Sequence, residues 1–332
     1  MKKKALVTGA AGFIGSHLIR ELYRNNIDVI ALDDLSGGYK ENIPKEIAFI
    51  EGTVNDFKLL ERLFEENKFN FVYHLAAYAA EGLSHFIRRF NYTNNLIGSI
   101  NLINESIKHN VECFVFTSSI AVYGAGQVPM NEDMMPQPED PYGIAKYAIE
   151  LDLKNAHEMF GLNYVIFRPH NVYGEFQNIG DKYRNVVGIF MNQILQNKPL
   201  SIFGDGRQKR AFSYVGDIIN PIATSPMNPK ALNQVFNIGA DHPVTVNELA
   251  KMVLSIMNKK DYPIEYQVAR NEVKIAYSDH TKAYNVFGEP QNTSLNDGLQ
   301  KMYDWVKLVG ARTTPKFKNI EIEKNLPPFW LK

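Results

Sequence analysis

The stretch Ala5-Leu-Val-Thr-Gly-Ala-Ala-Gly-Phe-Ile-Gly15 decides the fold of this 332-residue chain. Its short apolar run predicts a strand, and three glycines, Gly9, Gly12 and Gly15, follow that strand and open a predicted helix. Glycine permits a tight turn there and lets backbone amides approach a pyrophosphate at the positive end of the helix. The stretch therefore predicts a dinucleotide-binding strand–helix unit.

Short apolar runs alternate with helical patterns over the first two thirds of the chain, which is typical of a parallel sheet with crossover helices. The predicted strands cover residues 5–8, 28–32, 48–50, 71–75, 113–117 and 164–168. The predicted helices cover residues 14–25, 57–67, 93–110 and 142–160. A further run, Val235-Phe-Asn-Ile-Gly239, is expected to rejoin the sheet.

We therefore expect an α/β fold with a Rossmann-like, doubly wound parallel sheet and a smaller, interleaved C-terminal substrate-binding part. The NAD-binding domain is expected over residues 1–170, rejoined by segments near 211–240, and the substrate-binding domain mainly over residues 171–332.

Asp33 closes the second predicted strand about twenty residues after the glycines, where a carboxylate accepts hydrogen bonds from an adenosine ribose. Asp34 is the adjacent alternative for this role. A carboxylate here repels the extra phosphate of NADP, which favours NAD. The plain alternative is that the two aspartates only begin a turn before Ser36-Gly-Gly38.

Ser119, Tyr142 and Lys146 form the set of residues that indicates chemistry. Tyr142 and Lys146 are four residues apart, so on a helix they share one face, where an ammonium stabilises a phenolate. Ser119 ends the predicted strand in Phe116-Thr-Ser-Ser119. Taken alone, the Tyr142–Lys146 spacing is also typical of a solvated helix pair. Together with the glycine loop, it predicts acid/base catalysis beside a nucleotide.

Composition argues against several classes of partner. Thirty-six basic residues balance thirty-six acidic ones, so no global field favours nucleic acid or an anionic membrane. The single cysteine, Cys113, lies in an apolar run, fits a reducing cytosol and is expected in the core. We expect a cytoplasmic protein with a small substrate, no signal peptide, no membrane span and no metal site.

In these residues the chain resembles the extended short-chain dehydrogenase/reductases, and within them the nucleotide-sugar epimerases similar to UDP-glucose 4-epimerase. The resemblance covers almost the whole chain and is more specific for the superfamily than for one sugar. The motifs that carry it are Thr8-Gly-Ala-Ala-Gly-Phe-Ile-Gly15, Leu32-Asp-Asp-Leu-Ser36, His74-Leu-Ala-Ala77, Asn94-Asn-Leu-Ile-Gly98, Thr117-Ser-Ser-Ile-Ala-Val-Tyr-Gly124, Pro141-Tyr-Gly-Ile-Ala-Lys146, Arg168-Pro-His-Asn-Val-Tyr-Gly174 and Ile202-Phe-Gly-Asp-Gly206.

The resemblance implies that Tyr142 is the base, Lys146 its cofactor-bound partner and Ser119 the hydroxyl that faces the reacting sugar oxygen. The implied cofactor contacts are Gly9, Gly12, Phe13, Ile14, Gly15, Asp33, Asp34, Val54, Leu75, Ala76, Ala77, Asn95, Ser118, Tyr142 and Lys146. The implied substrate contacts are Ser119, Asn171, Asn185, Val186, Ile202, Phe203, Arg210, Arg270 and Ala276. The alternative for Ile202, Phe203 and Ala276 is plain core packing, and for Arg210 a surface charge. The polar stretch 173–185 is expected to shape a substrate pocket.

The implied activity is NAD-dependent inversion of C4 of a UDP-hexose, of the glucose/galactose type with or without an N-acetyl group. Tyr142 would take the C4 hydroxyl proton while hydride moves to NAD, and the transient 4-keto sugar would turn and be reduced on its other face. Ala276, placed beside the sugar's C2 group, would leave room for an acetamido substituent.

Three alternatives remain open from the sequence. A nucleotide-sugar 4-dehydrogenase or ketoreductase would use the same triplet once and release its product. A 4,6-dehydratase needs acid/base residues after Ser119, where this chain has Ile120 and Ala121, neither of which transfers a proton. A non-catalytic NAD sensor would not need the intact triplet.

The resemblance also implies a homodimer through a four-helix bundle of the helices that start near Thr93 and Tyr142.

Overall fold

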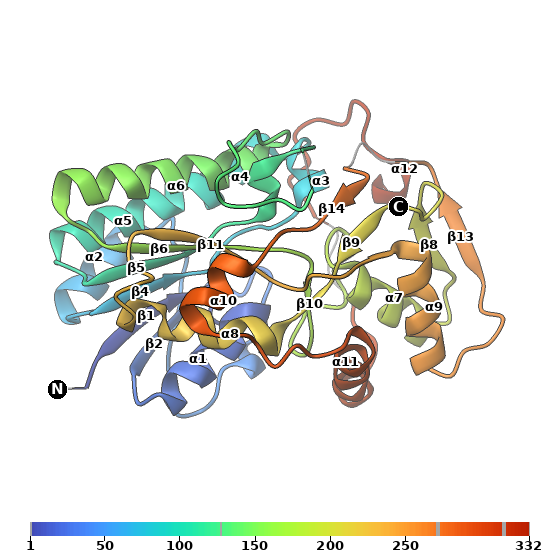
Figure 1. Ribbon diagram of the computed structural model, residues 1–332, viewed down its shortest axis with the longest axis horizontal. Coiled ribbons are helices and arrows are strands. Elements are labelled where there is room, and N and C mark those ends of the chain that lie inside the picture. The colour runs from blue at the N-terminus through green and yellow to red at the C-terminus, as the bar shows by residue number, and fades with distance from the viewer. Residues whose placement is uncertain (1, 127, 270–272, 314–316, 332) are drawn as a thin grey trace.

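A seven-stranded parallel sheet forms the centre of the computed structural model, which describes residues 2–126, 128–269, 273–313 and 317–331 (Figure 1). The strand order is β11-β6-β5-β4-β1-β2-β3. The strands are β1 Lys4–Thr8, β2 Asp28–Asp33, β3 Ala48–Glu51, β4 Phe71–His74, β5 Cys113–Thr117, β6 Tyr164–Pro169 and β11 Gln234–Ile238. The order reverses between β1 and β4, so a crevice opens at their carboxyl ends, where ligands bind in such sheets.

Helices cover both faces of this sheet (Figure 1). One face packs against α1 Phe13–Arg24, α8 Val215–Thr224 and α10 Thr281–Phe287, and the other against α2 Phe57–Glu66, α5 Gly98–Lys108 and α6 Pro141–Phe160. Alternation along the strands fixes this division: Val115 of β5 packs on the first of these faces, and Phe114 and Phe116 pack on the other. The inner strands β1, β4 and β5 are largely apolar on both faces because both faces are covered.

The sequence predictions for the sheet are confirmed. Every predicted strand is present to within one residue at each end, and β11 rejoins the sheet beside β6, with Phe236 opposite Phe167. The fold class predicted from the sequence is therefore correct.

The helix predicted over residues 93–110 differs from the structure. The helical path begins earlier, with α4 Arg88–Tyr92, and passes through a π-helical turn, Thr93–Ile97, before α5. Asn95 in this turn is fully buried and bonds the loop at Tyr78. The next residue, Gly98, must be small, because a Cβ there would lie 2.5 Å from the side chain of Val54. Tertiary contacts rather than local propensity set this boundary.

A second hydrophobic core lies beside the carboxyl edge of the sheet and is built mainly from α7 Val186–Leu195, α9 Val246–Ile256 and α11 Leu295–Val309. Short strands surround it: β7 Val172–Tyr173, β8 Leu200–Phe203, β9 Lys209–Ala211, β10 Ser213–Tyr214, β12 Pro243–Thr245, β13 Ile264–Gln267 and β14 Ile275–Ala276. The short helices α3 Glu81–Ser84, α4 and α12 Pro328–Leu331 close the remaining side. Among the described residues, no helix combines the length and apolar character needed to cross a lipid bilayer.

A buried ion pair joins α6 to β6. Glu150 is fully buried and accepts hydrogen bonds from Arg168 and from the hydroxyl of Ser118. Arg168 also donates from Nη1 to the Tyr123 hydroxyl at 2.7 Å, and that hydroxyl donates to Oδ1 of Asn237 on β11. Full hydrogen bonding of both charges is what makes such burial tolerable.

Replacing Arg168 with methionine should leave the Glu150 carboxylate buried and unpaired. We expect the free energy of unfolding, measured by denaturant titration, to fall by about 3–5 kcal/mol. The double variant Arg168→Met/Glu150→Leu should regain much of this loss, because no buried charge is left without a partner. Arg24→Met is the control: its side chain is 73% exposed and its partner is Glu21. If Arg168→Met lowered the free energy of unfolding as little as Arg24→Met does, the buried ion pair would not contribute to stability.

Candidate active site

A cleft of about 980 Å³ opens at the carboxyl edge of the sheet and continues along the second core. It brings together most of the residues that the sequence singled out. On the sheet side it is lined by Gly9, Gly12, Phe13, Ile14, Gly15, Asp33, Asp34, Val54, Leu75, Ala76, Ala77, Ser118, Ser119, Tyr142 and Lys146. On the other side it is lined by Asn171, Asn185, Val186, Ile202, Phe203 and Arg210.

The glycine loop is built for close backbone approach. Gly9 has φ +69°, and a Cβ there would lie 2.7 Å from the amide nitrogen of Ala76, while a Cβ on Gly15 would collide with the carbonyl oxygen of Gly9. Helix α1 starts directly after Gly12, and among the described residues no side chain caps this end. Its first amides therefore remain available to the cleft, which fits a dinucleotide diphosphate.

Asp33 ends β2 at the rim of the cleft. Its Oδ2 accepts a hydrogen bond from the amide of Ala11 at 3.0 Å, and its Oδ1 from the amide of Leu35 at 2.8 Å. Burial raises the pKa of the Asp33 carboxyl, and these amide bonds oppose the shift. The carboxylate thus fixes the glycine loop and still faces the cleft with its remaining acceptor sites. Asp34 instead accepts from the amide of Ser36.

The catalytic triplet predicted from the sequence is assembled by α6 and the end of β5. Asp140 caps α6 by accepting from the amides of Tyr142 and Gly143, both at 2.9 Å. Gly143 must be small because a Cβ there would lie 2.6 Å from the carbonyl oxygen of Ala121. This close packing brings Tyr142 within hydrogen-bonding reach of Ser119.

Lys146 lies one helical turn after Tyr142, as predicted. Its Nζ is 5.8 Å from the centre of the Tyr142 ring and donates to the carbonyl oxygen of Thr117 at 2.7 Å. The Thr117 hydroxyl, at the same strand end, is buried and has no hydrogen-bond partner among the described residues. A buried hydroxyl facing a cleft has capacity to bond a ligand.

Burial shifts the pKa values of both Tyr142 and Lys146. It raises the pKa of Tyr142, against the hydrogen bond from Ser119, and it lowers the pKa of Lys146 to about 7, against the field of Glu150. In the protein alone, therefore, the phenol is neutral at neutral pH. A positive charge brought into the cleft beside Tyr142 lowers its pKa and favours the phenolate.

The residues implied for the substrate line the far side of the cleft. Asn171 has φ +40° and donates from Nδ2 to the carbonyl oxygen of Ala211. Asn185, with φ +63°, begins α7. Arg210 of β9 donates to the carbonyl oxygens of Val273 and Lys274, so its guanidinium is held at the cleft edge. The polar stretch 173–185 contributes Tyr173, Gln177, Asn178, Tyr183 and Arg184 to the lining, as expected.

Three expected contacts are placed differently by the structure. Asn95 is 1% exposed and is not among the described residues that line the cleft; it bonds both the amide and the carbonyl of Tyr78 and so holds the loop that does. Ala276 packs in a core cluster with Tyr123 and Met130 rather than at a gate. Ile202 reaches the cleft, yet its side chain is fully buried in the second core.

For Asn95 and Ala276 the implied direct contact is therefore corrected. The π-helical turn points Asn95 inward, and pairing of β14 with β9 places Ala276 opposite Arg210, with its side chain in the core. Arg270 lies outside the described residues.

Arg184 and Tyr78 are cleft residues that sequence reasoning missed. The Arg184 guanidinium lies 4.8 Å from the centre of the Tyr78 ring, and its Nε donates to Asp181 at 2.7 Å. Asp181 holds the pKa of Arg184 raised even though burial lowers it. The only signal in the sequence was the polar character of residues 173–185, which gives no indication of which side chain turns inward.

His74, at the end of β4, is buried next to the cleft and contacts the hydroxyls of Thr8 and Ser99. The Ser99 hydroxyl donates to the carbonyl oxygen of Asn95, so it accepts from His74 Nε2, and His74 Nδ1 accepts from the Thr8 hydroxyl at 2.7 Å. Burial, followed by the field of Lys146, lowers the pKa of His74 to about 3. The histidine is therefore neutral, with its proton on Nε2.

The glycine loop, the acidic residue at the end of β2 and the triplet define a dinucleotide-binding enzyme of the short-chain dehydrogenase/reductase type. The chain belongs to the NAD dependent epimerase/dehydratase family, whose pattern matches residues 5–239. NAD is the cofactor of this family.

Named relatives agree with this assignment. The putative UDP-glucose 4-epimerase of Methanocaldococcus jannaschii is 35% identical over 91% of this chain and 98% of its own length. The structure of Thermotoga maritima UDP-glucose 4-epimerase with UDP-glucose is similar with a TM-score of 0.88, at 36% identity over 92% of this chain and 99% of that one. The UDP-N-acetylglucosamine 4-epimerase of Methanobrevibacter ruminantium, solved with UDP-N-acetylmuramic acid, has a TM-score of 0.86 at 30% identity, over 93% and 100%.

The buried, neutral His74 should make the protein sensitive to acid. Between pH 6.5, the ordinary histidine pKa, and about 3, the unfolded chain binds a proton at this site and the folded chain does not. The free energy of unfolding should therefore fall as the pH falls, by about 1.4 kcal/mol per pH unit from this group. His74→Gln removes the titration and should reduce the slope by that amount in denaturant titrations from pH 6 to pH 4. An unchanged slope would mean that His74 protonates without unfolding.

Proposed function

We propose that this protein is an NAD-dependent nucleotide-sugar 4-epimerase that inverts C4 of a UDP-hexose through a transient 4-keto intermediate. One observation carries the proposal: Ser119, Tyr142 and Lys146 meet in one cleft with the glycine loop and with the polar residues of the second core. The similarity to UDP-sugar 4-epimerases over nine tenths of the chain supports it.

The residues of the chain act on the proton and the oxygen of the sugar's C4 hydroxyl. Tyr142 takes the proton from the C4 hydroxyl, Ser119 bonds the same oxygen, and the Lys146 ammonium stabilises the phenolate. Gly9, Gly12, Gly15 and Asp33 hold NAD, which when bound supplies the hydride acceptor and a positive charge. The raised pKa of Tyr142 in the protein alone makes this charge a requirement for the base.

A 4,6-dehydratase needs acid/base residues after Ser119, and this chain has none at the two positions that follow. Ile120 and Ala121 open a short 3₁₀ turn, and the amide of Ala121 donates to the Ser119 hydroxyl at 3.1 Å. The backbone at this point orients the catalytic serine, and neither side chain transfers a proton. Single use of the triplet, by a 4-dehydrogenase or ketoreductase, remains the alternative that product analysis decides.

The sugar's C2 substituent is unassigned, because Ala276 lies in the core and gives no gate. The relatives differ at this position of the sugar, since one was solved with UDP-glucose and another with UDP-N-acetylmuramic acid. We propose UDP-hexoses as the substrate class, with or without an N-acetyl group.

The two proposed binding functions are divided between the part built on the central sheet and the part built on the second core. We propose that residues 1–170, with the rejoining segments near 211–240, bind NAD and that residues 171–332 mainly bind the sugar nucleotide. A cytoplasmic location is proposed as well, because Cys113, the single cysteine, is a buried thiol on β5 and suits a reducing compartment. Cell fractionation would test the location.

Tyr142→Phe keeps the ring and removes the base. We expect turnover to fall by roughly two to four orders of magnitude, with folding and bound NAD retained, measured by NMR of UDP-glucose and UDP-galactose without added NAD. Tyr147→Phe, on the same helix, is the matched control and should turn over normally. Near-normal activity of Tyr142→Phe would refute the acid/base assignment. Formation of a 4-keto product in place of the epimer by the unmodified protein would favour the dehydrogenase alternative.

We propose that the protein is a homodimer through α6 and the helical path leading into α5. Ile144 and Leu151 of α6 are 41% and 48% exposed, and Ile97 before α5 is 52% exposed. Because Ile144 and Leu151 are seven residues apart, they share one helix face. An apolar face of this kind suits helix packing between two copies.

Leu151→Glu should place a charge in that interface without touching the cleft. We expect sedimentation to show a dimer for the unmodified protein and a shift towards monomer for the variant. Leu308→Glu is the control, since Leu308 is 86% exposed on α11 and lies outside the proposed interface. A monomeric unmodified protein, or a variant that stays dimeric, would contradict the interface.

A further inference from the structure

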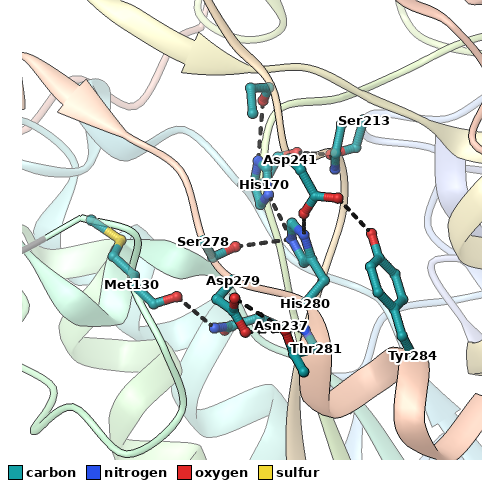
Figure 2. A network of polar contacts seen from close by, with 12 residues as sticks. Met130, His170, Ser213, Asn237, Asp241, Ser278, Asp279, His280, Thr281 and Tyr284 are labelled. Atoms are coloured by element: carbon teal, nitrogen blue, oxygen red, sulfur yellow. Dashed lines mark hydrogen bonds and ion pairs between the residues drawn. The ribbon is translucent and has the colours of Figure 1, made fainter. Parts of the chain in front are cut away.

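Two buried histidines, His170 and His280, contact each other, and Figure 2 shows them with their polar partners. His170 directly follows β6 and is 2% exposed, and His280 directly precedes α10 and is 1% exposed. Their Nε2 atoms are 3.1 Å apart. His280 Nδ1 lies 2.5 Å from Oδ1 of Asp241, whose Oδ2 accepts from the Tyr284 hydroxyl at 3.0 Å.

The partners of the outer nitrogens fix the protons on these rings. His170 Nδ1 faces the carbonyl oxygen of Ala211 at 3.1 Å, so this nitrogen must donate. His280 Nδ1 faces the Asp241 carboxylate and must donate as well. Two neutral rings would then carry no proton on either Nε2, and two lone pairs would meet at 3.1 Å.

A third proton between the two Nε2 atoms removes this conflict. The Ser278 hydroxyl, 3.1 Å from His280 Nε2, can donate to His280 alone and would leave the buried Nε2 of His170 facing a lone pair. With three protons the pair carries one positive charge, which Asp241 balances. The hydrogen bond from His280 lowers the pKa of Asp241, and burial, followed by the charge of His280, lowers that of His170 to about 3. The Asp241 carboxylate contacts His280, whereas His170 Nδ1 faces only a neutral carbonyl, so the geometry assigns the charge to His280.

The histidine pair is connected to the cleft through one carbonyl. The Ala211 oxygen accepts from His170 Nδ1 and also from Asn171 Nδ2, at 3.1 and 3.2 Å. Asn171 and Arg210, the neighbours of these two residues in the chain, both line the cleft. Ser213 strengthens the joint, because its hydroxyl donates to the carbonyl oxygen of His170 and accepts from the amide of Ala240.

We propose that His280 is held as an imidazolium that donates to Asp241 and to His170, and that this shared proton positions the Ala211 carbonyl, and with it Asn171 and Arg210, for the sugar nucleotide. His280 and His170 are positioning residues, since neither lines the cleft among the described residues. The inference deepens the proposed function, on which the identity of the ligand rests. The proton count on the two rings does not depend on it.

The proton count is tested by ¹⁵N NMR of the histidine rings in the complete protein at neutral pH. We expect two protonated nitrogens on His280 and one, Nδ1, on His170. In Asp241→Asn the third proton should be lost, because its balancing charge is gone. Singly protonated rings for both residues in the unmodified protein would overturn the proposal, whatever the substrate is.

The positioning role is tested by binding of UDP, measured by calorimetry, and by epimerase kinetics. For His280→Gln we expect the UDP dissociation constant and KM to rise about tenfold with kcat changed by less than about threefold, and bound NAD unchanged. Tyr284→Phe removes only one bond to Asp241 and should give a smaller rise in the same direction. His242→Gln, an exposed histidine beside Asp241, is the matched control.

Unchanged UDP affinity in both cluster variants, or a loss confined to kcat, would refute the positioning role. If the unmodified protein bound no UDP, the sugar-nucleotide assignment and this role would fail together, while the ring protonation would still be decided by NMR.

Discussion

The buried pair of Glu150 and Arg168 is the interaction on which the arrangement of the site depends. Glu150 lies one turn beyond Lys146 on α6 and accepts from Ser118, the neighbour of Ser119, as well as from Arg168 of β6. One carboxylate therefore fixes the helix that carries Tyr142, the strand end that carries Ser119 and the strand that leads to Asn171. Such a pair is tolerated in a core only when its lone pairs and protons are all bonded, which makes its geometry specific.

Around this pair, the cleft is held by polar groups whose protonation is fixed by burial. His74 bonds Thr8 and Ser99 behind the glycine loop, and its low pKa keeps it neutral beneath Lys146. A charged histidine there would lower the pKa of Lys146 further. The same burial raises the pKa of Tyr142, and a cation that enters the cleft would favour the phenolate that is proposed as the base.

The second core contributes the other wall of the cleft, and its attachment is local. Asn171 and β9 are joined at the Ala211 carbonyl, and Arg210 is held by carbonyls at the β14 end of the cleft. Because these bonds cross between segments far apart in the chain, this wall of the cleft is set by the sheet edge as well as by the second core. Figure 1 shows β9 and β14 lying together between the two parts.

The sequence by itself determined the fold class, every strand of the sheet and the placing of Tyr142 and Lys146 on one helix face, because strand runs, glycine turns and an i, i+4 pair are local patterns. Tertiary structure alone decided the direction of individual side chains. The π-helical turn sends Asn95 to the loop at Tyr78 instead of the cofactor side, and strand pairing buries Ala276 away from the sugar. Arg184 reaches the cleft, and His170 meets His280 across 110 residues of chain. Neither fact has a local signature, because contacts between distant segments are set by packing, not by sequence spacing.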